Sequence, residues 1–122
     1  YVKPVLALME EVRVHAMAHI TGGGLPENLP RVLPEGTRAV IDLGSWRLPP
    51  VFAWLQTQGG VADAEMRRTF NCGVGLVLCV PMVDAALACQ RLGDAGESAW
   101  ILGRIEATAG QTEVIFANGA AA

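Results

Sequence analysis

Apolar residues near the start of the chain recur at the spacing of a helix. Pro4 suits the first turn, and a single apolar stripe follows it, made of Val5, Leu8, Met9 and Val12. The pattern predicts a helix that packs this stripe into the core. From 14 to 20 the pattern changes to alternation, which predicts a strand with His15 and His19 on the same face.

The middle of the chain places short apolar segments between turn residues. We expect a short helix over 26–32, a strand over 37–42, a helix over 51–58, and a helix that ends at Arg68 with Asp63 as its N-cap. The range 73–80 is apolar at nearly every position, which is typical of a strand buried on both faces. We therefore predict that this strand lies centrally in a sheet covered by helices.

The last third of the chain predicts one more helix and two strands. The helix starts at Pro81, and its shared face carries Met82, Ala86, Cys89 and Leu92. The ranges 99–106 and 112–116 predict two strands joined as a hairpin by a polar turn. The order of elements predicts an α+β fold, layered as in α/β proteins, with a mixed sheet covered by helices and a partly ferredoxin-like topology.

Length and composition indicate how many domains the chain forms and whether part of its surface is covered by another domain or subunit. The chain has 122 residues, of which 52% are hydrophobic and 17% charged. We expect one domain over 1–117 and a disordered tail over 118–122. So low a charged share suggests that part of the surface is an interface with another domain or subunit. Because the chain starts at Tyr1 without methionine and turns helical almost at once, we interpret it as a piece of a longer polypeptide.

Charge and cysteine content argue against several classes of partner. The net charge is -3 and the nine Lys and Arg residues are scattered, so no nucleic acid is expected as a partner. No apolar run is long enough to span a membrane, so no membrane partner is expected either. The three cysteines form no CxxC pair, which favours free buried thiols in a reducing compartment. These features predict a cytoplasmic protein.

The richest chemistry lies where the first strand ends, at His19, Thr21 and the glycines Gly22, Gly23 and Gly24. Glycines accept positive φ and leave room for a ligand close to the backbone. Followed by a short helix, they are arranged like a site for phosphate or another small anion, but a structural tight turn explains the same residues. Glu27 and Asn28, on that short helix, can face the ligand or solvent.

His19 has two readings of its own. It can be a hydrogen-bonded structural residue at a strand end, or it can transfer protons or donate to phosphate. His15 lies too far along the strand to share a metal ion with it, and no Cys or carboxylate pattern completes a zinc site. We therefore expect no metal site formed by this chain.

Two further segments carry polar residues beside glycines. Asn71 and Gly73 precede the apolar strand, where Asn71 can satisfy local backbone groups and Gly73 can permit a bulge or the close approach of a ligand. At the end of another strand, Asp42 can cap the loop that follows, and Trp46 can pack against a neighbouring domain. No histidine and acid accompany Ser45 in a way that would make it a nucleophile.

Several of these segments together resemble one enzyme family. They are His19-Ile-Thr-Gly-Gly-Gly-Leu-Pro-Glu-Asn-Leu-Pro-Arg-Val-Leu-Pro34, Val51-Phe52-x-Trp54-Leu55-Gln56, Glu65-Met66-x-Arg68-Thr69-Phe70-Asn71-Cys72-Gly73-Val74-Gly75 and Ala99-Trp100-x-x-Gly103. With Ile41-Asp42 and Ser45-Trp46, they resemble the phosphoribosylformylglycinamidine cyclo-ligases, also called AIR synthetases. The resemblance runs from about His15 to Ile105 and is closest to the C-terminal domain of that family.

The resemblance implies an ATP-dependent step of purine biosynthesis. In that step ATP activates the formyl amide oxygen of formylglycinamidine ribonucleotide as a phosphoryl imidate. A nitrogen then closes the imidazole ring, which gives aminoimidazole ribonucleotide, ADP and phosphate. An N-terminal domain, absent from this chain, would hold most of the ATP and Mg²⁺ and form the core of a homodimer. The chain by itself would then be inactive.

The resemblance also implies roles for individual residues. It makes His19 the candidate catalytic residue, for proton transfer or for stabilising phosphoryl charge. Backbone that faces phosphate or substrate would come from Gly22, Gly23 and Gly24, with Thr21 beside them. Asn71 and Gly73 would line the cleft against the missing domain, and Asp42 and Arg68 would brace the loops.

Two other functions fit the same residues. One is a ligand-binding or regulatory module that reuses the fold without catalysis. The other is the matching domain of a sister ATP-dependent enzyme, such as a selenophosphate synthetase or a hydrogenase-maturation ATPase.

Overall fold

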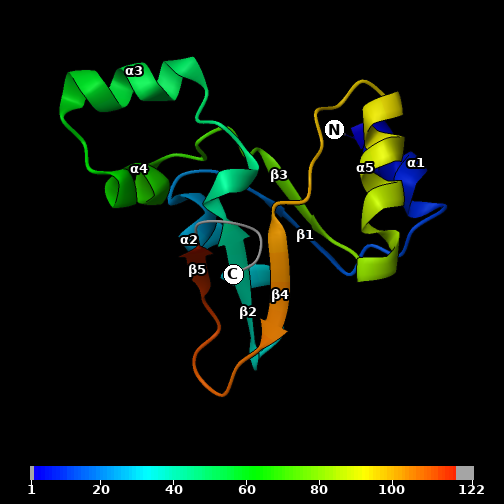
Figure 1. Ribbon diagram of the computed structural model, residues 1–122. Coiled ribbons are helices and arrows are strands. Elements are labelled where there is room, and N and C mark those ends of the chain that lie inside the picture. Colours follow the sequence, from blue (N-terminus) through cyan, green and yellow to red (C-terminus); the bar gives the residue numbers. More distant parts are fainter. Residues whose placement is uncertain (1, 118–122) are drawn as a thin grey trace. The chain divides into compact units, whose positions relative to one another are not determined.

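The computed structural model describes residues 2–117, which belong to two compact units (Figure 1). One unit contains the chain up to residue 17 together with 78–101, and the other contains 18–77 and the chain from 102 onward. The tail predicted over 118–122 lies outside the described residues. Within 2–117, no helix is long and apolar enough to cross a membrane.

The first unit is built on a pair of helices. Helix α1 (Val2–Met9) lies beside α5 (Ala85–Asp94), and the short helix η3 (Met82–Asp84) precedes α5 (Figure 1). Leu8, Val12 and Ala88 form the buried cluster between them. An ion pair of 3.0 Å between Arg91 Nε and Glu11 Oε2 links the same two segments.

Two expectations about this unit are wrong. Met9 is 46% exposed because a single partner helix covers only a narrow stripe and Met9 lies at its edge. Met82 is 85% exposed because it belongs to η3, so the apolar face of α5 does not extend to it. The stripe itself is confirmed for Val5, Leu8 and Val12, which are all buried.

The apolar strand is β3 (Leu76–Cys79), which pairs with β1 (Ala16–His19) in a two-stranded sheet. Backbone bonds join His15 N to Cys79 O at 2.8 Å and Ile20 N to Gly75 O at 2.9 Å. All four residues of β3 are only half-buried. The prediction of a central strand buried on both faces is therefore wrong, because an apolar run does not show how many strands flank it, and β3 has only β1 as a neighbour.

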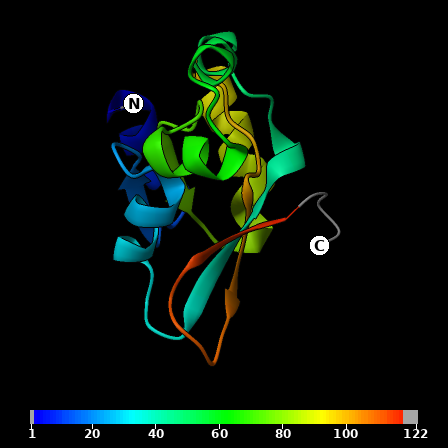
Figure 2. The same cartoon turned by 90° about the vertical axis from the view of Figure 1, so that its left-hand side faces the viewer.

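The second unit contains a three-stranded mixed sheet. Strand β2 (Thr37–Asp42) lies between β4 (Gly103–Ala107), which is antiparallel to it, and β5 (Val114–Ala117), which is parallel (Figure 2). Its Ala39, Val40 and Ile41 are at most 4% exposed. The predicted hairpin is wrong, because β4 and β5 pair with opposite edges of β2 and bury it instead of pairing with each other.

Short helices make up the rest of the second unit: α2 (Gly24–Asn28), η1 (Pro30–Val32), η2 (Leu43–Ser45), α3 (Pro50–Gly59) and α4 (Asp63–Thr69). Leu25, Leu29 and Met66 are buried where α2 and α4 approach each other. Ala62, not Asp63, is the N-cap of α4, and Asp63 Oδ1 instead accepts a bond from Gln56 Nε2 at 2.6 Å. The α+β class is confirmed.

Candidate functional site

The glycine loop joins β1 to α2 through a left-handed turn. Gly23 has φ of +95° and Gly24 has φ of +63°, a region that residues with a Cβ rarely adopt. Gly24 N donates to Thr21 O at 3.0 Å and closes the turn. The expectation that these glycines serve positive φ is thus confirmed for two of the three.

The side chain of Asn28 holds this loop from inside. Asn28 is 7% exposed, and its Nδ2 donates to the carbonyl oxygens of Thr21, Gly22 and Gly24 at 3.2, 3.3 and 2.8 Å. Thr21 Oγ1 in turn donates to Asn28 Oδ1 at 3.2 Å. Asn28 is therefore part of the loop's internal support, and Thr21 is partly engaged with it.

These bonds decide where the loop's N–H groups point. In a planar trans peptide the C=O and the N–H project in opposite directions. Because Asn28 binds the carbonyls of Thr21 and Gly22, the N–H groups of Gly22 and Gly23 point away from Asn28. Neither N–H has a protein acceptor among the described residues. The loop thus presents two unused donors, and the Glu27 side chain lies against Gly23 beside them.

The third glycine has a packing role. A Cβ on Gly24 would collide with the backbone carbonyl oxygens of Arg67 and Phe70 in α4 and just after it. Gly24 is buried and its N–H is used within the turn, so it presents no donor outward. A Cβ on Gly22, by contrast, would meet nothing within 4 Å.

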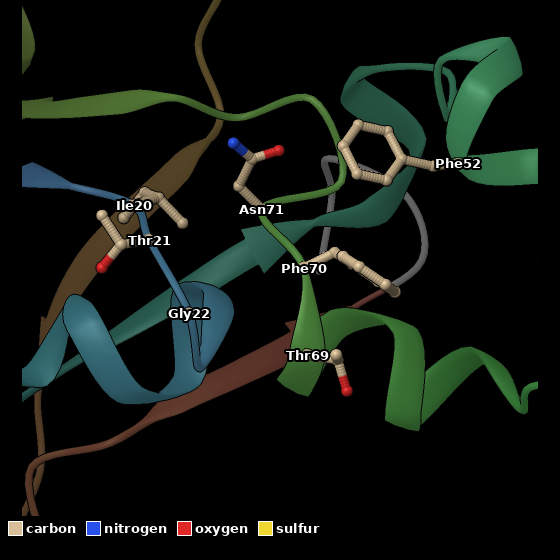
Figure 3. Close-up of a pocket in the computed structure, with 7 residues that line it drawn as sticks. All are labelled: Ile20, Thr21, Gly22, Phe52, Thr69, Phe70 and Asn71. Atoms are coloured by element: carbon tan, nitrogen blue, oxygen red, sulfur yellow. The ribbon is translucent and has the colours of Figure 1, made fainter. Parts of the chain in front are cut away.

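A small pocket of about 310 Å³ opens beside Gly22 (Figure 3). Its lining consists of Ile20, Thr21, Gly22, Phe52, Thr69, Phe70 and Asn71. Figure 3 shows Ile20 and Thr21 on one side, the two phenylalanines on the other, and Asn71 between them. The rings of Phe52 and Phe70 pack at 5.8 Å between centroids. The volume is at the lower limit for ligand pockets, so the site suits part of a ligand.

Asn71 and Gly73 form a tight turn at the edge of this pocket. Asn71 Oδ1 accepts from Gly73 N at 2.9 Å, while Asn71 Nδ2 has no bond to any described residue. Gly73 has φ of +97°, and a Cβ there would collide with Pro49. Asn71 therefore satisfies local backbone through its oxygen and still offers a donor. Gly73 does not line the pocket and serves the turn.

Cys72, between these two residues, is itself strained. It is 5% exposed and adopts φ of +54°, which is rare for a residue with a Cβ. Its carbonyl oxygen accepts from Trp46 Nε1 at 3.0 Å, and its Sγ contacts Met66 O at 3.4 Å. Trp46 therefore fixes the turn that carries Asn71.

Besides Gly23, Gly24 and Gly73, three predicted site residues lie outside the pocket lining. His19 is exposed at the end of β1. Asp42 Oδ1 accepts from Gly44 N at 2.8 Å, which confirms that it caps the following loop. The side chain of Arg68 is 70% exposed and lies 3.6 Å from Glu65 Oε2, a pairing that contributes little at the surface. The predicted set thus divides between the pocket (Thr21, Gly22 and Asn71) and its surroundings.

The cysteines and the acidic residues are the remaining groups that could take part in chemistry. All three cysteines are free. Burial raises the pKa of each thiol, and the Arg67 guanidinium partly offsets this rise in the pKa of Cys72. Within the part of the chain that the structure describes, no three His, Cys, Asp or Glu residues gather closely enough to hold a metal ion.

Sequence reasoning missed the apolar half of the pocket. Ile20, Phe52 and Phe70 read as ordinary core residues because they recur within apolar segments. Thr69 carried no signal of its own. A clue did exist, since all four lie within the segments 19–34, 51–56 and 65–75 that carry the family resemblance.

The sequence matches one protein family over nearly its whole length. Residues 1–115 match the family model described as "AIR synthase related protein, C-terminal domain". The chain belongs to this family. The resemblance seen in the sequence motifs is confirmed.

Individual proteins that carry a functional name are also similar to this chain. The chain is 57% identical over 108 residues to proteins named phosphoribosylformylglycinamidine cyclo-ligase from Burkholderia mallei (strain SAVP1) and Burkholderia pseudomallei (strain 668). Each match covers 88% of this chain and 31% of the relative. The chain therefore spans about a third of the length of these relatives.

Proposed function

We propose that this chain is the C-terminal domain of a cyclo-ligase that converts formylglycinamidine ribonucleotide and ATP into aminoimidazole ribonucleotide, ADP and phosphate. The observation that carries the proposal is the 57% identity, over nearly the whole chain, to proteins with that name. The glycine loop supplies the physical support, because a phosphoryl group carries negative charge and the loop presents two unused N–H donors.

In this proposal Gly22 and Gly23 bind a phosphoryl oxygen through their N–H groups, and Thr21 lies beside them. Asn71 Nδ2 donates to a polar group of the substrate, while Phe52 and Phe70 exclude water from that side. His19, two residues before Thr21 and exposed, transfers a proton or stabilises phosphoryl charge. When bound, ATP supplies the phosphoryl group that activates the formyl amide oxygen, and Mg²⁺ neutralises its phosphates.

The residues fit only part of such a ligand. The described residues hold no cluster that suits Mg²⁺, and the pocket of about 310 Å³ is too small for ATP together with a ribonucleotide. We infer that Mg²⁺ and most of the ATP are held by an amino-terminal domain of a longer, homodimeric, cytoplasmic protein. The C-terminal domain formed by this chain would then supply one wall of the active site.

A chimera tests the proposal. This chain would replace the matching C-terminal region of the Burkholderia mallei cyclo-ligase, and the chimera would be assayed for formation of aminoimidazole ribonucleotide. We expect turnover, because a chain that is 57% identical over 108 residues shares the fold of the region that it replaces. The matched control is the relative cut and rejoined at the same junction with its own C-terminal region.

The outcomes separate the competing functions. A folded chimera without turnover, beside an active control, would contradict the proposal and favour a binding module without catalysis. A chimera that consumes ATP only with a different acceptor would point to a sister ATP-dependent enzyme.

A further inference from the structure

Helix α3 is less covered than α2 and α4, the other α-helices described in its unit, each of which has at least one buried residue. None of its ten residues is buried. Figures 1 and 2 show it beyond α4, on the side remote from the three-stranded sheet. Its anchors are few: Phe52 packs on Phe70, and Gln56 Nε2 donates to Val61 O at 3.0 Å and to Asp63. A helix this short is marginal in water unless one face is packed.

The first two turns of the outer face of α3 are apolar. At 100° per residue, Val51, Trp54 and Leu55 lie on one side of the helix, away from Gln56, and Gln58 follows on that side in the last turn. Val51 is 58% and Trp54 59% exposed, while Leu55 is half-buried. The whole range 48–62 contains no charged residue. Lack of charge around an exposed tryptophan is typical of the centre of an interface.

The size of this face indicates what covers it. Three side chains on one helix fall well short of the roughly 20–30 residues per side that a stable complex of separate proteins uses. A covalently attached partner needs far less area, because tethering gives effective concentrations on the order of millimolar. The chain matches a C-terminal domain and spans 31% of its relatives, so such attached polypeptide exists in those proteins.

We propose that the α3 outer face, defined as Val51, Trp54 and Leu55, is the surface on which the amino-terminal part of the longer protein docks. This inference rests on the proposed function, since it requires the chain to belong to a longer enzyme. It also links docking to the site, because Phe52 on the adjacent side of the same helix lines the pocket. The attached part would then hold α3 and complete the open pocket.

Site-specific cross-linking in the chimera tests the inference. A photo-reactive benzophenone amino acid would replace Trp54 in one variant and Ala53 in the matched control. Ala53 is exposed on the same helix but lies about 100° around its axis from Trp54. We expect position 54 to cross-link to peptides of the amino-terminal part, and we expect that product to be lost at position 53. Val51 provides a second probe if the first variant misfolds.

Each outcome decides the inference. Cross-links from 54 or 51 to the amino-terminal part support it. Products that join two copies of α3, identified by mixing isotopically light and heavy protein, would overturn it, as would equal labelling from position 53 or no product from either probe. Turnover of the chimera is measured separately. An active chimera without the cross-link would contradict docking on the α3 outer face but not the proposed reaction. A cross-linked but inactive chimera would contradict the proposed reaction but not the docking.

Discussion

Three adjacent glycines perform three different tasks at the residue scale. Gly22 opens onto the pocket, Gly23 takes the left-handed turn, and Gly24 lets α2 approach the backbone of α4. The sequence shows only that each lacks a side chain. The division of tasks depends on Asn28, which lies several residues away and determines which carbonyls point inward.

The contrast between Gly22 and Gly24 is testable. Gly24→Ala should lower the free energy of unfolding by at least about 1–2 kcal/mol, because it combines a left-handed backbone with a collision against two carbonyl oxygens. Gly22→Ala should change it by less than about 0.5 kcal/mol, since the new Cβ meets open space. Denaturant unfolding of both variants beside the parent chain measures the two effects.

Turnover should respond to Gly22→Ala even though the free energy of unfolding does not. In the chimera, Gly22→Ala places a methyl group on the pocket wall, so we expect turnover to fall while the protein stays as stable as its parent. A Gly22→Ala variant with full turnover would argue that no ligand approaches this backbone. Equal stability of the two variants would contradict the packing role of Gly24.

Elements were predicted from the sequence more reliably than their partners were. The strand over 37–42 and the helices near 51–58 and 63–68 are local features, set by alternation and helical period, and they occur as expected. Pairing depends on residues far apart in the chain. The hairpin prediction failed because β2, with Ala39, Val40 and Ile41 almost fully covered, takes both later strands as neighbours.

One cross-strand contact makes the pairing of β2 with β4 sensitive to acid. Arg38 and Glu106 face each other in register, and Arg38 Nε donates to Glu106 Oε1 at 2.7 Å. This bond holds the pKa of Glu106 below its ordinary value of 4.5, and Arg104 adds to the effect. A lowered pKa in the folded state stabilises the protein above pH 4.5, and the contribution is lost as pH falls through the folded-state pKa.

The expected result is a loss of part of the acid sensitivity in Glu106→Gln. Denaturation midpoints measured from about pH 7 down to about pH 3 should differ between variant and parent at neutral pH and converge in acid. Glu113→Gln is the matched control, because Glu113 belongs to no ion pair found among the described residues. Parallel curves for Glu106→Gln and its parent would refute the role of this pair.

At the scale of the whole molecule, the candidate site combines residues of two kinds. The polar members Thr21, Gly22 and Asn71 could be predicted because their types indicate chemistry. Phe52 and Phe70 could not, since an aromatic residue that lines a pocket and one that fills a core give the same pattern. His19 belonged to the predicted set, but it lies at the end of β1 outside the pocket lining. Its proposed role depends on a ligand that extends beyond this pocket.

The isolated chain provides the last test, which concerns the molecule as a whole. We expect the chain of 122 residues to fold but to form no aminoimidazole ribonucleotide from ATP and substrate, because its pocket of about 310 Å³ is too small for ATP together with a ribonucleotide. The measurement is a turnover assay, with circular dichroism and cooperative denaturation to show that the chain is folded. The active chimera serves as the control for the same sequence in a complete protein. Robust turnover by the folded chain alone would show that it needs no second domain, and the proposed division of the active site would be wrong.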